Sequence, residues 1–394
     1  MPHHDPDANT IAAALELLTR HGFDGLARPL EMLMNEAMKL ERSAFLGAGP
    51  WERSDDRIGH ANGFKSKKVK TGVGELSLRI PKVCGLSDDV APFYPQAIER
   101  GTRVDDALKA TLAEMYVQGV STRKVKQITE KLCGTQISSS QVSRLTKSLD
   151  EGLEAWRERP IGRIRYLILD ATYVKVRHGG SVLDCAVLIA AGVQQEDGKR
   201  TVLGCSVSLS EAEVHWRGFL EQLISRGMHG IELITSDHHS GLRAAIRATL
   251  PSVAWLRCQV HLQRNATAHV PKVDMRQKVA REIRSIFNAP DQSEALRLLQ
   301  MMVDRYRKTA PGLAEWLEGN IPDGLNVFQA PIEHQRRLRT SNLLERLNRE
   351  LKRRTRVASL FPNEASALRL ASAVLAETSD EWESGRVYLS MEIV

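Results

Sequence analysis

Three acidic residues lie at positions where a carboxylate can act in catalysis or bind a metal ion. Asp170 interrupts the most hydrophobic part of an expected strand, 164–177, where a charge is costly unless it is paired, protonated or bound to a cation. Asp237 follows the expected strand 231–236, at a strand-to-helix junction of the kind that carries active groups in α/β sheets. Glu345 lies beside the leucine stripe of an expected helix. Taken singly, each has a structural explanation, such as a turn contact, a helix cap or an ion pair.

Taken together, the three carboxylates indicate a site for divalent metal ions. The expected fold makes the first and fourth strands neighbours, so Asp170 and Asp237 face each other, and the helix 340–354 can bring Glu345 to the sheet. Converging carboxylates without a cation raise one another's pKa values. Two Mg²⁺ or Mn²⁺ ions about 4 Å apart relieve that repulsion and support phosphoryl transfer. The sequence therefore predicts a two-metal site on Asp170, Asp237 and Glu345.

The elements that must position these carboxylates follow Pro160. Alternation and helical periodicity predict strands and helices in the order β-β-β-α-β-α-β, at 164–177, 181–193, 201–208, 210–226, 231–236, 241–250 and 253–260. This order resembles the ribonuclease-H-like fold, an α/β architecture with a mixed five-stranded sheet. Residues from about 262 to 333 have helical periodicity throughout, which predicts an all-α insertion before the last helix.

The N-terminal part has the features of a DNA-binding region. Residues from about 8 to 45 predict two helices around a break at Gly22–Gly25, and the segment 75–81 predicts a short strand. A basic loop before that strand carries Lys65, Lys67, Lys68 and Lys70. Between 105 and 149 a helix-turn-helix pattern follows, whose second helix exposes Gln141, Arg144 and Lys147, residue types able to reach base edges or phosphates. A solvated lysine face and an ordinary helical hairpin are the alternatives.

Charge and composition favour a polyanionic partner. The 394-residue chain has a net charge of +7 and a pI near 9.2. Residues 336–356 hold nine basic residues against two acidic ones, and the candidate DNA contacts among them are Arg336, Arg337, Arg349, Lys352, Arg353 and Arg354. The longest apolar run, 185–193, is too short to cross a membrane, and five scattered cysteines do not form a disulfide framework. With no secretory signal pattern, a cytoplasmic, nucleoid-associated protein is expected.

Cys258 and His261 form a Cys-x-x-His pair just after the last expected strand. A structural zinc site has four ligands, and the sequence offers no second pair nearby. A structural or DNA-positioning role is therefore expected for this pair.

Several blocks of the chain carry a more specific signal. These blocks are LDATYVKVR (169–177), SEAEVHW (210–216), TSDHHSGLRAA (235–245), RCQVHLQRN (257–265), RTSNLLERLNRELKRRTRV (339–357), NGFKSKKVKTGVGELSLRIPK (62–82), AEMYVQGVSTRKV (113–125) and FPNEAS (361–366). In collinear order, they resemble the mutator-type bacterial insertion-sequence transposases. One departure is Leu343, where the family usually has a proline.

The resemblance implies an Asp-Asp-Glu triad at Asp170, Asp237 and Glu345, divalent metal, and double-stranded DNA as substrate. Such enzymes cut the terminal inverted repeats of their own element and join the ends to target DNA, a task that requires a homodimer or a larger homo-oligomer. A catalytically inactive DNA-binding regulator and a nuclease that cuts without joining are the alternatives. The three intact carboxylates favour the transposase.

The expected organisation is a mainly helical DNA-binding region followed by a split catalytic core. Its segments are N-terminal helices (1–60), a basic loop with a short strand (61–100), a helix-turn-helix-like region (101–160), the first part of the core (161–262), the α-helical insertion (263–335), and the last core helix with C-terminal helices (336–394).

Overall fold

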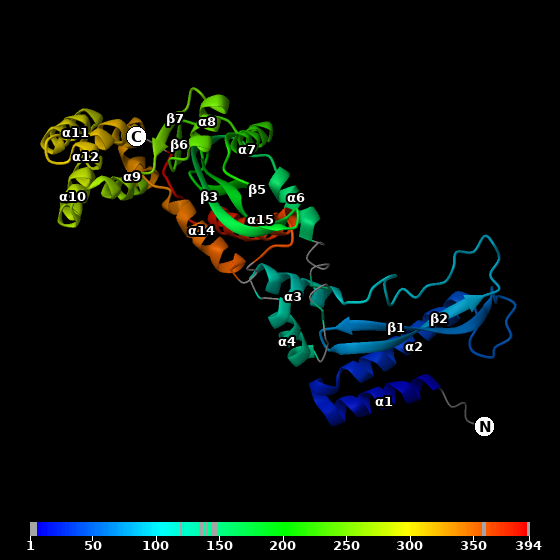
Figure 1. Ribbon diagram of the computed structural model, residues 1–394. Coiled ribbons are helices and arrows are strands. Elements are labelled where there is room, and N and C mark those ends of the chain that lie inside the picture. Colours follow the sequence, from blue (N-terminus) through cyan, green and yellow to red (C-terminus); the bar gives the residue numbers. More distant parts are fainter. Residues whose placement is uncertain are drawn as a thin grey trace. The chain divides into compact units, whose positions relative to one another are not determined.

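The computed structural model describes residues 6–118, 120, 122–133, 137–138, 141–142, 149–356 and 360–391. The chain divides into two compact units, Met1–Ser148 and Leu149–Val394, and each is described by itself. Figure 1 labels their helices and strands. No helix in the described part of the chain is both long enough and apolar enough to span a membrane.

The first unit opens with the two expected helices. Helix α1 (Pro6–His21) and helix α2 (Ala27–Leu46) flank a 3-10 turn at Gly22–Gly25. Helix α2 packs on a hairpin of strands β1 (His60–Thr71) and β2 (Gly74–Cys84), with Met38 buried against the apolar face of β2. The Glu31 carboxylate on α2 also accepts a hydrogen bond of 2.9 Å from the Ser77 amide of β2.

The lysine-rich segment is a strand, and the expectation of a basic loop is wrong. Pairing between β1 and β2 continues through all four lysines, with Val69 buried between them. Because side chains alternate along a strand, Lys68 and Lys70 lie on one face and Lys65 and Lys67 on the other. The segment has few residues that favour strands by themselves, so its conformation depends on its partner strand.

Two further helices complete the described part of this unit. Helix α3 (Asp106–Val117) begins at Asp105, whose carboxylate accepts a hydrogen bond of 3.4 Å from the Leu108 amide. Helix α4 (Thr122–Cys133) follows, and Val125 and Ile137 are buried in the same small core. The second helix of the expected helix-turn-helix lies for the most part outside the described residues.

The second unit is built on the expected mixed five-stranded sheet, with strand order β5-β4-β3-β6-β7. Strands β3 (Ile164–His178), β4 (Ser181–Gln194) and β5 (Arg200–Ser208) pair antiparallel. Strands β6 (Leu233–Ser236) and β7 (Ala254–Arg257) run parallel to β3, and β6 is its direct neighbour. The prediction that the first and fourth strands are adjacent is thereby confirmed.

Helices cover both faces of this sheet (Figure 1). Helices α7 (Glu213–Ser225) and α8 (Ser240–Thr249) pack on the face that buries Leu167, Leu169 and Trp216. Helices α14 (Asn342–Thr355) and α15 (Glu364–Ser384) contact the other face. Between β7 and α14 the α-helices are α9 (Gln259–Ala266), α10 (Arg276–Phe287), α11 (Gln292–Tyr306), α12 (Pro311–Asn320) and α13 (Ile332–Leu338). All of them except α13 share a core of their own, to which the 3-10 segment Ile321–Gln329 also contributes.

The last strand is shorter than the expected 253–260. The chain leaves the sheet after Arg257, where the Cys258 amide donates to Ser236 O at 2.9 Å and the Gln259 amide donates to Arg339 O at 2.9 Å. Helix α9 starts at Gln259, so His261 lies in the first turn of a helix.

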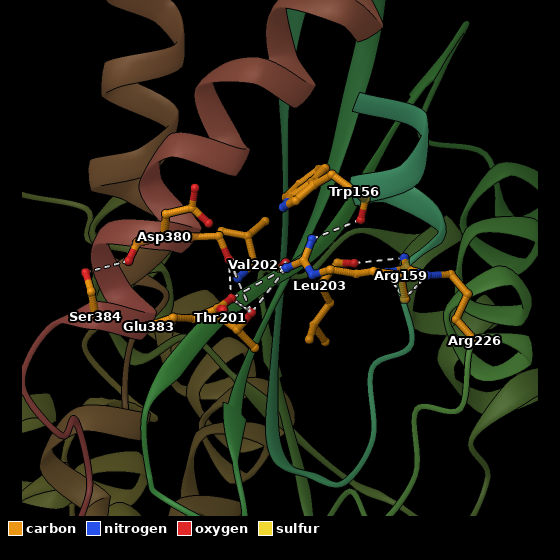
Figure 2. A network of polar contacts seen from close by, with 10 residues as sticks. Trp156, Arg159, Thr201, Val202, Leu203, Arg226, Asp380, Glu383 and Ser384 are labelled. Carbon is orange, nitrogen blue, oxygen red and sulfur yellow. Dashed lines mark hydrogen bonds and ion pairs between the residues drawn. The ribbon is translucent and has the colours of Figure 1, made fainter. Parts of the chain in front are cut away.

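A half-buried arginine joins the edge strand of the sheet to two helices (Figure 2). The Arg159 guanidinium donates hydrogen bonds to Trp156 O of α6 (Asp150–Glu158) at 3.0 Å, Val202 O at 2.7 Å and Thr201 Oγ1 at 3.3 Å of β5, and Ser379 Oγ of α15 at 3.3 Å. Arg226 in turn donates to the Arg159 carbonyl at 2.8 Å. The network holds α15 against the sheet, on the same face as α14.

Candidate active site

Strand register places two of the predicted carboxylates at one edge of the sheet. Leu169 of β3 pairs with Ser236 of β6, so Asp170 and Asp237 follow at equivalent positions on parallel neighbours. The Ala171 amide donates to Asp170 Oδ1 at 2.9 Å. Burial, and then the charge of Asp237, raise the pKa of Asp170 to about 7. Because ionisation of the Asp170 carboxyl group is costly here, a cation bound beside it would stabilise the ionised form.

The third carboxylate comes from the first turn of α14. Glu345 lies three residues before Asn348, whose side-chain amide donates to Asp170 Oδ2 at 2.7 Å. This hydrogen bond ties the helix directly to β3. The helix starts without the family's proline: Leu343 is buried, and the Ser341 amide donates to Cys258 Sγ at 3.4 Å.

His261 lies among these carboxylates, which the sequence did not indicate. Its Nδ1 contacts Asp237 Oδ1, and its Nε2 lies 3.6 Å from Glu345 Oε1. Ligand atoms of Asp237, Cys258 and His261 all lie within 4.8 Å of one another. Hydrogen bonds to Asp237 and to Cys258 raise the pKa of His261 to about 10. The Cys-x-x-His spacing was the one feature of the sequence that could have indicated His261. The side chain reaches the carboxylates because α9 begins at Gln259 and places His261 in its first turn.

These side chains fit a hard divalent cation. In the described part of the chain, His261 is the only basic side chain within 4.0 Å of a carboxylate oxygen of Asp170, Asp237 or Glu345. The cluster therefore carries excess negative charge, and its donors are the carboxylate oxygens that Mg²⁺ and Mn²⁺ prefer. The mixed set of Asp237, Cys258 and His261 provides fewer than the four ligands of a structural zinc site.

Basic side chains on the exposed face of α14 line a groove of about 640 Å³ with Tyr173 and Lys175 of β3. Those on the helix or just after it are Arg349, Lys352, Arg353 and Arg356. Arg336 and Arg337 are also exposed, on α13, and the Arg337 guanidinium lies 4.8 Å from the Tyr388 ring centre.

Arg354 is not available to DNA, contrary to its assignment from sequence. Its side chain is 9% exposed and donates to Glu350 of its own helix at 2.7 Å and also to Glu377 of α15. Helical periodicity puts it on the buried stripe with Leu347 and Leu351. It links two helices of the core.

One of the DNA-binding residues predicted in the helix-turn-helix-like region forms hydrogen bonds within the protein as well. The Gln141 side chain accepts a hydrogen bond of 2.9 Å from the Ser138 amide, while Ser138 Oγ accepts one of 3.2 Å from the Gln141 amide. This reciprocal capping box engages the side chain of Gln141, a residue that the sequence predicts to reach base edges or phosphates. Arg144 and Lys147 lie outside the described residues.

Among the lysines of β1, Lys67 donates to Tyr94 Oη at 3.1 Å, and Lys68 forms an ion pair of 2.7 Å with Glu75. Lys65 and Lys68 are exposed, whereas Lys67 and Lys70 are half-buried. The four lysines are therefore not one continuous basic patch.

Comparisons with known proteins give the family. Residues 7–385 match the family model described as "Transposase, Mutator family". The chain is 55% identical over 386 residues, 98% of each chain, to a transposase for insertion sequence element IS406 of Burkholderia multivorans. It is 37% identical over 375 residues, 92% of each chain, to a transposase for IS256 in transposon Tn4001 of Staphylococcus aureus. A Drosophila P element transposase structure matches with a TM-score of 0.41 at 9% identity, over 69% of this chain and 92% of that one. The chain belongs to the Mutator family of transposases.

Proposed function

We propose that this protein binds the terminal inverted repeats of its own insertion sequence and catalyses metal-dependent DNA cleavage and strand transfer. The observation that carries the proposal is the convergence of Asp170, Asp237 and Glu345 from β3, the end of β6 and α14. The strand order β5-β4-β3-β6-β7 supports a ribonuclease-H-like catalytic core. The nearly full-length relatedness to insertion-sequence transposases supports the substrate class.

Asp170, Asp237 and Glu345 would hold two Mg²⁺ or Mn²⁺ ions, which when bound activate the attacking oxygen and stabilise the leaving oxygen of a phosphodiester. Asn348 orients the Asp170 carboxylate by its hydrogen bond of 2.7 Å. His261 contacts both Asp237 and Glu345 and holds them at one site. The reaction needs no covalent protein nucleophile, so positioning is the main contribution of the side chains.

The exposed basic face of α14 is suited to the DNA backbone. Arg349, Lys352, Arg353 and Arg356 line a groove that also includes Tyr173, three residues beyond Asp170. Contacts of this kind neutralise phosphates without reading sequence, so this part of the affinity falls as salt rises. Reading of the inverted repeat is assigned to the N-terminal unit. Joining two element ends requires at least a homodimer.

The test is incubation of the purified protein with a labelled terminal-repeat duplex, a plasmid target and Mg²⁺ or Mn²⁺. Joined product is expected. Cleavage without joining indicates a nuclease, and retention of the duplex without reaction indicates an inactive regulator. Glu345→Gln should abolish the reaction and preserve binding of the duplex. Glu333→Gln, an exposed acid on α13, is the matched control and should react as the wild type does.

A further inference from the structure

The excess positive charge of the α-helical insertion is concentrated in helices α9 and α10 and the segment between them. Residues 259–287 contain six basic residues against two acidic ones, whereas residues 288–338 contain six against seven. All six basic side chains of the first segment are exposed, and they are Arg264, Lys272, Arg276, Lys278, Arg281 and Arg284. The function proposed above gives them no partner, since its DNA contacts lie on α14 and in the N-terminal unit.

Three of these side chains lie on one face of α10. Helical spacing puts Lys278, Arg281 and Arg284 opposite the stripe that is buried in the core of the insertion. That stripe consists of Val279, Ile283, Ile286 and Phe287. Glu282 is the one acidic residue of α10, and it contacts the guanidinium of Arg305 on α11. The exposed face of α10 therefore presents positive charge that no acid of the same helix offsets.

The absence of ion pairs distinguishes this face from the exposed arginines of α11. Arg297 pairs with Glu294 at 2.6 Å, and Arg307, just after the helix, pairs with Asp304 at 3.6 Å. For the three basic residues of the α10 face, no carboxylate of the described residues lies within 4.0 Å. Because the apolar side of α10 is already buried, the helix has no free apolar face for a membrane surface. The partner that fits is a polyanion.

Helix α9 connects this region to the carboxylate cluster. His261, which contacts two of the carboxylates, lies in its first turn, and Arg264 and Asn265 follow one turn later, about 5.4 Å along the helix. Both are exposed and share a face with His261, because residues three and four apart are neighbours on a helix. Next to Arg264, Gln263 Nε2 donates to Ala280 O of α10 at 3.0 Å, and α9 runs between the sheet and α10 (Figure 1).

We propose that Lys278, Arg281 and Arg284 of α10, together with Arg264 of α9, form a second DNA-binding surface that contacts the phosphate backbone of a duplex. The proposal rests on the function proposed above, which requires the protein to hold two duplexes, an element end and a target. The three residues of α10 span about 9 Å of the helix. Duplex DNA carries about five phosphate charges over that length. Such contacts neutralise phosphates without reading the base sequence.

The experiment measures affinity for two labelled duplexes by fluorescence anisotropy, with Mg²⁺ and in the Glu345→Gln background so that no reaction follows binding. One duplex carries the terminal repeat, and the other has an unrelated sequence and represents the target. Lys278→Gln/Arg281→Gln/Arg284→Gln removes three charges and keeps side chains that favour helices. If three phosphate contacts are lost, the slope of log Kd against log salt should fall by about 2.7. The ratio of wild-type to variant affinity should then rise about 40-fold from 200 to 50 mM salt.

The matched control is Arg217→Gln/Arg297→Gln/Arg307→Gln, which removes the same charge from three exposed arginines that form ion pairs on α7 and α11. It should change the slope by less than about 1. A second variant, Arg281→Lys/Arg284→Lys, keeps the charges and should keep the wild-type slope, since a lysine also neutralises a phosphate. This variant separates loss of charge from a change in the packing of α10.

A smaller slope on the terminal repeat alone supports the surface and assigns it to the element end. A smaller slope on the unrelated duplex supports it and assigns it to the target. A wild-type slope on both duplexes, a loss no larger than that of the control, or an equal loss in the lysine variant would overturn the proposal. Failure of the parent protein to bind either duplex would instead contradict the function proposed above, so the two failures are distinguishable.

Discussion

Replacing Arg159 by methionine should destabilise the second unit by about 3 kcal/mol. The charged hydrogen bonds to Val202 O at 2.7 Å and Trp156 O at 3.0 Å are the strongest of its contacts, and such bonds contribute roughly 1.5–3 kcal/mol each. Because the Arg159 side chain is 27% exposed, part of this is lost to solvent screening. Methionine keeps most of the apolar stem but leaves the carbonyl of buried Val202 without this donor, which costs about 1–3 kcal/mol. The network is the one drawn in Figure 2.

The assay is urea unfolding followed by tryptophan fluorescence. Five of the six tryptophans belong to the second unit, so the signal reports chiefly on that unit. The matched control is Arg297→Met, which removes an exposed ion pair of 2.6 Å with Glu294 on α11 and should cost less than about 0.5 kcal/mol. A loss below about 1 kcal/mol for Arg159→Met, or equal losses for the two variants, would refute this reasoning.

Three further changes test other parts of the structure. Asn348→Ala removes the hydrogen bond to Asp170 and should slow strand transfer about 10- to 100-fold with DNA binding retained; an unchanged single-turnover rate would contradict it. Gly198→Ala should cost more than about 3 kcal/mol in thermal unfolding, because φ is 67° and a Cβ would lie 1.8 Å from Leu389 O, whereas Gly312→Ala in open space should not destabilise. Trp51 has φ of 63° and is fully exposed, so Trp51→Gly should be more stable than Trp51→Ala by about 1 kcal/mol; the opposite order of melting temperatures would count against that strain.

Much of the second unit could be predicted from local patterns. The run of β-branched and aromatic residues around Asp170 marks β3, and the turn at 196–199 marks the hairpin to β5. Few sheet orders accommodate that succession of elements, so the adjacency of β3 and β6, and with it the pairing of Asp170 and Asp237, could also be predicted. The leucine stripe of α14 indicated which side of the helix meets the sheet.

Other features were decided only by the tertiary structure, because they depend on contacts between residues far apart in the chain. His261 joins the carboxylates because backbone hydrogen bonds from Cys258 to Ser236 and from Gln259 to Arg339 end β7 and start α9 there. Arg354 is buried because Glu377 of α15 lies opposite it. The lysines of β1 occupy two faces because β2 imposes strand pairing on them.

The sequence by itself determined the chemical types of the side chains and the periodicity of their elements, since both are properties of neighbouring residues. The three-dimensional packing decided which charges are exposed and which are paired. That choice depends on the free energy of burying a charge beside a partner that is distant in the chain, and no local pattern contains this information.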